Sequence, residues 1–181
     1  GDLYLNGLTS LTDSPGHIAL TKKLASIKDD ELSLESLKTL NAATAEVLSK
    51  YKMELLLDGL TSLTDDAARA LSRQKGQLSL TGLKSLSDTA ANALSKHDGN
   101  LYLYGLKSLS DAAAEALSKY EGILGLSLTS LSDSPGHVAL VLKLSKQEYY
   151  LSLDSLISLS DAAAEALSKH KGELSLDSLT L

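Results

Sequence analysis

Residues 101–119 read LYLYGLKSLSDAAAEALSK, and this stretch decides the fold because near-copies of it fill the chain. The copies start at Leu3, Leu32, Leu55, Leu78, Leu101, Leu124 and Leu151, and a partial copy starts at Leu174. From Leu32 to Leu124 each copy begins 23 residues after the one before it. A fixed period of this size is typical of a solenoid, in which each unit buries its apolar face only against its neighbours. We therefore interpret residues 1–181 as a single repeat domain.

Each repeat reads as a strand, a tight turn and a short helix. Leu101 and Leu103 alternate with other residues at a period of two, which is typical of a short strand with both leucines facing the core. Ser110-Asp111 then begins a helix, because both residue types are favoured at helix N-termini. Gly122 follows the helix and ends it.

Stacking such repeats predicts the architecture of the whole chain. The strands form one parallel sheet, and the helices lie behind it. A helix is roughly 10 Å wide, whereas neighbouring strands lie about 4.8 Å apart, so the stack has to curve. The expected fold is an α/β solenoid with a curved parallel sheet on its concave side and short helices on its convex side.

The repeats resemble those of the leucine-rich repeat family along essentially the whole chain. The resemblance rests on Leu-x-Leu pairs, each followed by a third leucine, at Leu3/Leu5/Leu8, Leu32/Leu34/Leu37, Leu55/Leu57/Leu60, Leu78/Leu80/Leu83, Leu101/Leu103/Leu106 and Leu151/Leu153/Leu156. The helical half is most similar to the ribonuclease-inhibitor-like subclass and to similar bacterial repeats. The family places a ladder of asparagines where this chain has the third leucine, and a hydroxyl column runs nearby instead, at Ser10, Thr39, Ser62, Ser85, Ser108, Ser130 and Ser158. The resemblance implies recognition of a macromolecule on the concave face and no chemistry.

The composition excludes several classes of function. The net charge is −6, and acids and lysines are mixed along every repeat, so a nucleic-acid partner is disfavoured. No apolar run approaches the roughly 18–20 residues that a membrane span needs. Cysteine is absent, which removes disulfides and thiolate chemistry. The chain begins with Gly1 and has no signal peptide, so we expect a processed or excised segment. An extracellular or cell-surface location in a bacterium is the setting that we favour for an interaction scaffold of this kind.

Two repeats, those that start at Leu3 and Leu124, depart from the pattern. Both are long and carry the same insert, DSPGHIAL at 13–20 and DSPGHVAL at 133–140. Serine followed by proline is typical of a helix start, so we expect longer helices within Ser14–Ala25 and Ser134–Lys146, with Pro15 and Pro135 in their first turns. The repeat at Leu124 is also one residue short in its turn, which predicts an irregular turn there.

The histidines are better explained by packing than by chemistry. His17 and His137 are five repeats apart, hence roughly 24 Å at strand spacing, so they cannot share one metal ion. His97 and His170 occupy a position that other repeats fill with tyrosine or glutamine, which indicates a role at the helix end.

The aspartates and serines also favour a structural interpretation. One aspartate per repeat could form a cation column, but Asn41 interrupts it and helix N-capping explains each member: Asp13, Asp65, Asp88, Asp111, Asp133 and Asp161. No nucleophile elbow, phosphate loop or dinucleotide motif occurs. The sequence therefore predicts no catalytic residue, no cofactor and no metal, and a protein that is not an enzyme.

The solvent-facing positions of the sheet predict where a partner binds. The residue inside Leu-x-Leu is serine in four repeats, whereas tyrosine and leucine at these positions stand out. Exposed tyrosines are frequent in binding hot spots because little entropy is lost when they are ordered. We therefore predict a partner-binding surface made of Tyr4, Leu56, Lys84, Tyr102, Tyr104 and Lys107.

Three functions fit this surface. The favoured one is a non-catalytic scaffold that binds a protein on its concave face. The second is a structural array element without a ligand, as the near-identity of residues 110–119 and 160–169 suggests. The third is a carbohydrate-binding module that uses Tyr4, Tyr102 and Tyr104. Neither end carries a polar capping repeat, so we also expect end-to-end self-association, strongest at Leu174–Leu181.

Overall fold

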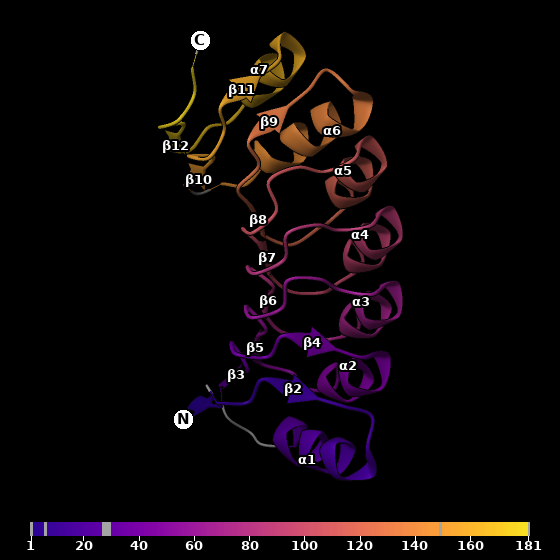
Figure 1. Ribbon diagram of the computed structural model, residues 1–181. Helices are drawn as coiled ribbons and strands as arrows, with labels where there is room; N and C mark the ends of the chain where they lie inside the picture. Colours follow the sequence, from indigo (N-terminus) through magenta and orange to yellow (C-terminus); the bar gives the residue numbers. More distant parts are fainter. Residues whose placement is uncertain (1, 6, 27–29, 149, 181) are drawn as a thin grey trace.

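The computed structural model describes residues 2–5, 7–26, 30–148 and 150–180, with the backbone alone for residues 2–4. Helices lie in one column and the main strands in another, so that the chain climbs from repeat to repeat (Figure 1). The seven helices of the described residues are α1 (Pro15–Ala25), α2 (Ala42–Leu48), α3 (Asp65–Leu71), α4 (Asp88–Leu94), α5 (Asp111–Ser118), α6 (Pro135–Leu144) and α7 (Asp161–Leu167). Each of them packs against the next along the chain.

The predicted parallel strands are confirmed at the Leu-x-Leu positions. Six of them form one sheet in the order β1 (Asp2–Tyr4), β3 (Glu31–Ser33), β5 (Glu54–Leu56), β6 (Leu78–Ser79), β7 (Leu101–Leu103) and β8 (Leu124–Leu126). The register aligns the first leucine of every repeat with the first leucine of the next. Leu101 and Leu103 are 0% exposed, so the leucines of β7 face the core as expected.

The expectation of one continuous sheet is wrong. β10 (Leu151–Ser152) pairs with β12 (Leu174–Ser175) in a separate two-stranded sheet, and no ladder joins β8 to β10 in the described residues. Two irregularities meet at this break. The turn after β8 lacks the backbone hydrogen bond that closes the corresponding turn of the other described repeats, which confirms the irregular turn, and α6 is longer than its neighbours. Between β8 and β10 the chain therefore follows a different path from that between the other neighbouring strands, and β10 does not come to lie beside β8 as the next strand of the sheet.

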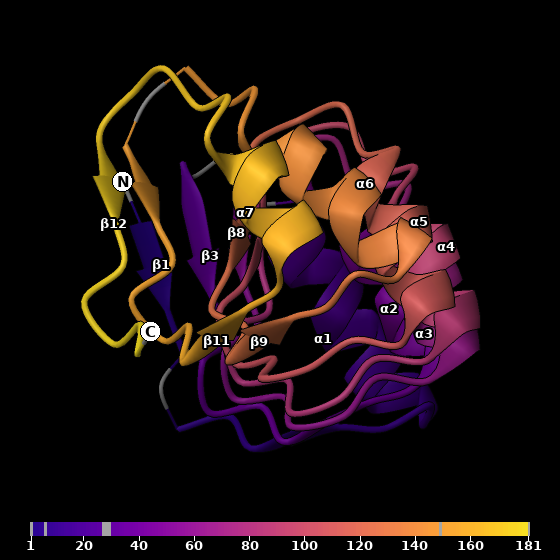
Figure 2. The same ribbon diagram turned by 90° about the horizontal axis from the view of Figure 1, so that it is seen from above.

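Two further strand pairs were not predicted. Seen from above, β9 and β11 lie below α7, between the strands of the sheet and the column of helices (Figure 2). The pairs are β2 (Ser10–Leu11) with β4 (Thr39–Leu40), and β9 (Ser130–Leu131) with β11 (Ser158–Leu159). They begin at members of the hydroxyl column, yet the side chains of that column are exposed, and no hydrogen bond joins them within the described ranges. The column is thus no substitute for an asparagine ladder.

The helices begin where the caps predicted them to begin. The hydroxyl of Ser110 accepts a hydrogen bond from the N–H of Ala113, and α5 buries alanines and one leucine against the sheet. The two inserts form longer helices, as predicted: α1 has 11 residues and α6 has 10, against seven or eight in the others. Pro15 and Pro135 are the first residues of these two helices, where their missing N–H costs nothing.

The aspartates, in contrast, are not the N-caps. The capping side chains belong to serine, threonine or asparagine, and Asp65 and Asp88 instead accept hydrogen bonds from the serine that caps the next helix, Ser87 and Ser110 respectively. Asp111 continues this chain by accepting from the N–H of Gly136 at 2.6 Å. We call this arrangement the aspartate–serine ladder. Because it links each described helix start from α3 to α6, it is what gives these aspartates their regular spacing.

A second column runs inside the helix ends. Its members are large and polar, and several reach back to a backbone carbonyl of the preceding repeat. Gln74 donates to the carbonyl of Met53 at 2.6 Å, and the hydroxyl of Tyr120 donates to the carbonyl of Gly99 at 2.5 Å. The predicted helix-end role of the histidines is confirmed here. The helix-end column consists of Tyr51, Gln74, His97, Tyr120, Gln147 and His170.

Candidate binding surface: an aromatic cleft at the break in the sheet

Tyr102 and Tyr104 form the most prominent aromatic feature on the sheet. Their rings stack with centroids 5.7 Å apart and an interplanar angle of 14°, and the Tyr104 side chain is 44% exposed. The neighbouring strand carries Gly125 opposite Tyr102. A Cβ atom at Gly125 would lie 2.5 Å from Cζ of Tyr104 and 2.7 Å from Cδ1 of Tyr102, so only glycine lets the two rings lie in this position. Burial, followed by the proximity of Tyr102, raises the pKa of Tyr104.

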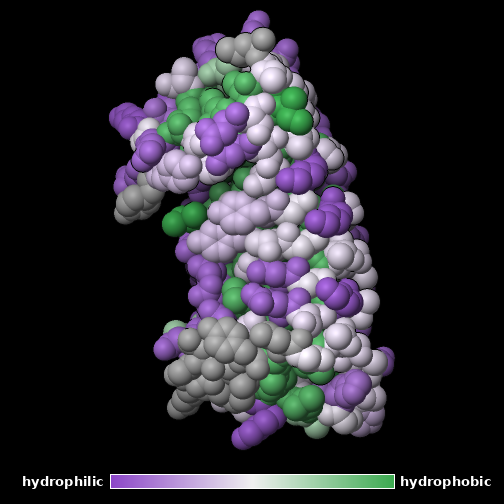
Figure 3. Space-filling view, turned by 60° about the vertical axis from the view of Figure 1, so that its left-hand side comes forward, coloured by the Kyte–Doolittle hydropathy of each residue, from purple (hydrophilic) through white to green (hydrophobic). Residues whose placement is uncertain are grey.

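A cleft of about 160 Å³ opens beside these rings, where β8 and β10 fail to pair. Three of its lining side chains are large, apolar and exposed: Tyr104 at 44%, Ile123 at 44% and Tyr150 at 56%. They are three of the seven exposed large hydrophobic residues in the described part of the chain, so exposed apolar surface is concentrated here. Figure 3 shows the molecule hollowed at this level, beneath the overhanging C-terminal repeats.

Gln147 takes the place of a strand at the edge of β8. Its Oε1 accepts the N–H of Leu124 at 2.8 Å, and its Nε2 donates to the carbonyl of the same residue at 3.3 Å. The side-chain amide of Gln147 thus makes the two hydrogen bonds with Leu124 that the two peptide groups flanking one residue of a neighbouring strand would make. The donor edge of β8 is only partly satisfied by this arrangement. In the preceding repeats the second leucine donates across the sheet, as Leu80 does to the carbonyl of Tyr102 at 2.9 Å, whereas the N–H of Leu126 has no such acceptor among the described residues.

Two lysines line the adjoining hollow of about 350 Å³, which shares Ile123, Gln147 and Tyr150 with the cleft. Lys143 is half-buried and donates to the carbonyl of Gly122 at 2.8 Å. Burial, and then the nearby charge of Lys146, lowers the pKa of Lys143. Neither lysine makes an ion pair with a described carboxylate.

The structure brings together part of the predicted partner-binding surface. Tyr102 and Tyr104 are in contact, but Leu56 lies two strands from Tyr102, roughly 10 Å away at the usual spacing. Lys84 and Lys107 are exposed on the turns, and Lys107 donates to the Ser155 hydroxyl at 3.4 Å, two repeats further on.

Tyr4 stands apart from the other predicted residues. Tyr4 lies in β1 and pairs with Ser33 of β3. Its strand is four strands away from that of Tyr102, which is roughly 19 Å at strand spacing. Its side chain lies outside the described residues.

Sequence reasoning missed Ile123 and Tyr150, although a signal was present. The residue before Leu-x-Leu is polar in the other repeats, at Asp2, Glu31, Glu54, Gln77, Asn100 and Glu173. Only Ile123 and Tyr150 break this rule, and they precede the two strands that flank the break. Gln147 gave no such signal, because glutamine also occurs at its position as Gln74.

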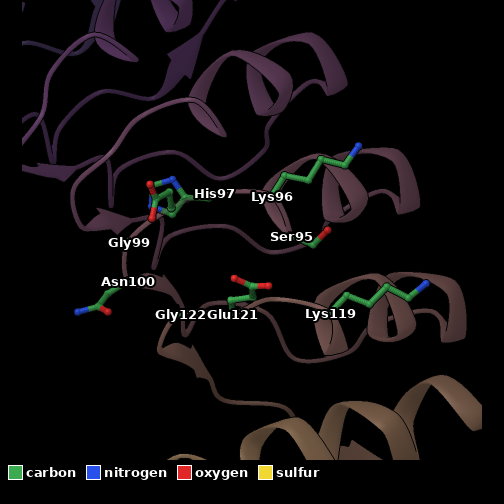
Figure 4. A pocket seen from close by; sticks show the side chains of 9 residues that line it. Ser95, Lys96, His97, Gly99, Asn100, Lys119, Glu121 and Gly122 are labelled. Carbon is green, nitrogen blue, oxygen red and sulfur yellow. The ribbon is translucent and has the colours of Figure 1, made fainter.

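A larger hollow of about 610 Å³ lies between the ends of α4 and α5. Figure 4 shows that its functional groups do not converge, because Lys96 and Lys119 extend from the helix ends while His97, Asn100 and Glu121 lie on the loops. His97 is 4% exposed, and its ring is parallel to that of Tyr120 with centroids 6.4 Å apart. The ring belongs to the helix-end column and offers no assembled site.

His17 and His137 lie at helix starts. Nδ1 of His137 accepts the N–H of Ser132 at 3.1 Å and lies 2.8 Å from its hydroxyl, and His17 makes the same contacts with Thr12. Within the described ranges no group of three or more histidine, cysteine, aspartate or glutamate side chains could hold a metal ion. These contacts thus position the backbone before α1 and α6.

Comparison with protein-family models and with curated proteins finds no match for this chain. In the described residues no helix has both the length and the apolar character needed to cross a membrane.

Proposed function

We propose that this chain is a solenoid of the leucine-rich-repeat type whose sheet forms the concave face and whose helices form the convex face. The aligned leucines, the parallel register and the stacked helices support this assignment. The hydrogen bond between Lys107 and Ser155 supports a bend toward the sheet, because it joins side chains two repeats apart.

We further propose that the protein is a non-catalytic scaffold that binds another protein on the sheet side. The observation that carries this proposal is the stacked, partly exposed pair of Tyr102 and Tyr104 at the margin of a cleft. Aromatic anchors beside a pocket are typical of interface hot spots, since a rigid ring buries a large apolar area at a small entropic cost. Tyr102 lies in β7 and its ring stacks on that of Tyr104, so each ring restricts the other, which lowers that cost further.

A carbohydrate ligand is the second candidate, because a sugar ring can stack on an exposed tyrosine as a protein side chain can. The spacing on the sheet leaves Tyr102 and Tyr104 to this role without Tyr4. A single stacking platform accommodates one or two sugar units, so the carbohydrate hypothesis predicts weak binding by the isolated chain.

The experiment compares three purified proteins: the wild-type chain, the Tyr102→Ala/Tyr104→Ala variant and a control, Thr89→Ala/Asn92→Ala, on the exposed face of α4. Each is tested by affinity enrichment of proteins and on a glycan array. We expect the wild type and the control to enrich the same protein partners, and the tyrosine variant to enrich none of them. Equal retention by all three proteins, or binding to glycans alone, would contradict the proposal.

A further inference from the structure

We propose that the cleft between β8 and β10 binds an extended peptide segment of a partner protein, which adds to the open edge of β8 and carries an acidic residue next to a large apolar one. This inference deepens the proposed scaffold function and depends on it, since it names the class of partner segment and the place where it binds.

The first step is the edge of β8 itself. An exposed strand edge binds extended chains because its N–H and C=O groups repeat at the spacing of a partner strand. The Leu126 N–H lacks an acceptor among the described residues, and the Leu124 groups are held only by the Gln147 amide. The free protein thus already pairs β8 with a peptide-like group. A peptide that displaces the Gln147 amide and also reaches Leu126 makes one hydrogen bond more than the amide does.

The second step is the pair of apolar residues that flank the break. Ile123 and Tyr150 occupy a position that is polar in every other repeat, and both are about half exposed. Together with Tyr104 they line a volume of about 160 Å³. At about 30 Å³ per water molecule this space holds roughly five waters, which suits one large side chain and excludes a helix.

The third step is the charge of the adjoining hollow. Lys143 and Lys146 are close enough for their charges to oppose each other, and no described acid pairs with either of them. Glu121 and Glu148 also line the hollow, but both are exposed, whereas Lys143 is half-buried. A half-buried charge acts through a lower effective dielectric constant than an exposed one, so Lys143 acts on a group inside the hollow more strongly than either glutamate does, which favours an acidic side chain there.

The test uses a random linear peptide library displayed on phage, selected against the whole chain. A selected peptide is then titrated into the ¹⁵N-labelled protein and followed by the shifts of backbone amide signals. We expect enrichment of an acidic residue near an aromatic or large aliphatic one. The largest shifts are expected at Leu124, Leu126 and Ser152.

Four variants refine the assignment. Ile123→Gln/Tyr150→Gln restores the polar residue type that Gln77 shows at the same repeat position, so the fold is retained while affinity falls at least about tenfold. Met53→Gln, which changes an exposed apolar side chain away from the cleft, leaves affinity unchanged. Lys146→Ala lowers the affinity for the peptide and makes that affinity depend less on salt concentration. Lys96→Ala, at the equivalent position after α4, changes neither the affinity nor its salt dependence.

Each result separates this inference from the scaffold function. If the selected peptides shift amide signals only on β5 to β7, the proposal that the cleft binds a peptide is wrong, whereas the proposal that the sheet binds a protein stands. Selection of no peptide, while proteins are still retained through Tyr102 and Tyr104, would also overturn the cleft alone. Sugars that compete at Leu124 and Leu126 would replace the peptide by a carbohydrate. If the wild-type chain retains no protein and selects no peptide, both the scaffold function and the peptide-binding cleft are wrong.

Discussion

At the scale of single residues, the chain repeats a residue type only where the same contact recurs. The first leucine of each strand is between 0% and 2% exposed from Leu32 to Leu124, and it does not vary. The helix-end column varies from tyrosine to glutamine to histidine, because its common requirement is a long side chain that reaches a carbonyl of the preceding repeat. His97 meets this requirement least well. It is buried, and neither ring nitrogen makes a hydrogen bond within the described residues.

His97 should make the stability of the protein depend on pH. Burial lowers its pKa from the ordinary 6.5, although the nearby carbonyl of Gly76 and the charge of Asp98 act in the opposite direction. The unfolded chain therefore binds a proton at a higher pH than the folded chain does. The contribution of neutral His97 to stability is therefore fully present above its ordinary pKa of 6.5. It is lost as the pH falls from there toward the lower pKa that His97 has in the folded protein.

The measurement is urea unfolding at about pH 7 and about pH 5, on either side of the ordinary histidine pKa. We expect His97→Gln to lose less stability than the wild type between these two conditions, because glutamine fills the same position as Gln74 without a titrating group. His170→Gln, at the half-exposed equivalent position, is the control and should change the difference less. An unchanged pH dependence in His97→Gln would show that this ring does not carry the effect.

At the scale of elements, the short helices depend on their N-termini. An isolated helix of seven or eight residues is unstable in water, so α2 to α5 need packing and caps to form. The aspartate–serine ladder supplies both a cap and a link to the next helix, since the serine hydroxyl accepts within its own helix and donates to the preceding aspartate.

Removing one serine of this ladder should destabilise the fold by about 1–2 kcal/mol, the usual loss at a helix N-cap. Ser87→Ala abolishes the bond from the N–H of Ala90, which is 3.0 Å long, and leaves the Asp65 carboxylate without its donor. Ser85→Ala removes an exposed hydroxyl two residues away that has no hydrogen bond within the described ranges, so it serves as the matched control. Thermal and urea unfolding of both variants provide the measurement, and equal stabilities would refute the role of the ladder.

At the scale of the whole molecule, the break between β8 and β10 divides the sheet while the other side of the stack stays joined. β9 pairs with β11 across the same boundary, and α6 packs against α7. The repeats on the two sides of the break are therefore connected through their turns and helices but not through the main strands. This leaves a cleft on the sheet side alone.

Hydrogen exchange should reveal the break in solution. The amide of Leu126 has no acceptor among the described residues, whereas that of Leu80 donates to the carbonyl of Tyr102 at 2.9 Å. We expect the Leu126 amide to exchange at least about tenfold faster, which corresponds to about 1.4 kcal/mol of opening free energy. Amide exchange followed by NMR provides the measurement. Equal protection of the two amides would indicate that β10 pairs directly with β8 in solution.

The sequence by itself determined the parts of this structure that depend on short spacings. Leu101 and Leu103 alternate within one strand, Ser110 caps a helix that starts at the next residue, and Pro15 marks a longer helix. Each of these features involves residues close together in the chain, so the pattern and the structure share one cause. The same holds for the two stacked tyrosines, which are two residues apart: Tyr102 lies in β7 and Tyr104 directly follows it.

Only the tertiary structure decided what residues from different repeats do together. Gln147 looks like any member of the helix-end column, yet it pairs with Leu124 because the strand that should lie there is displaced. Ile123 and Tyr150 line a cleft for the same reason. In a stack of repeats, small differences in turn and helix length add up over tens of residues. The position of one strand edge relative to the next therefore follows from the packing of whole repeats and cannot be derived from the spacing within any one of them.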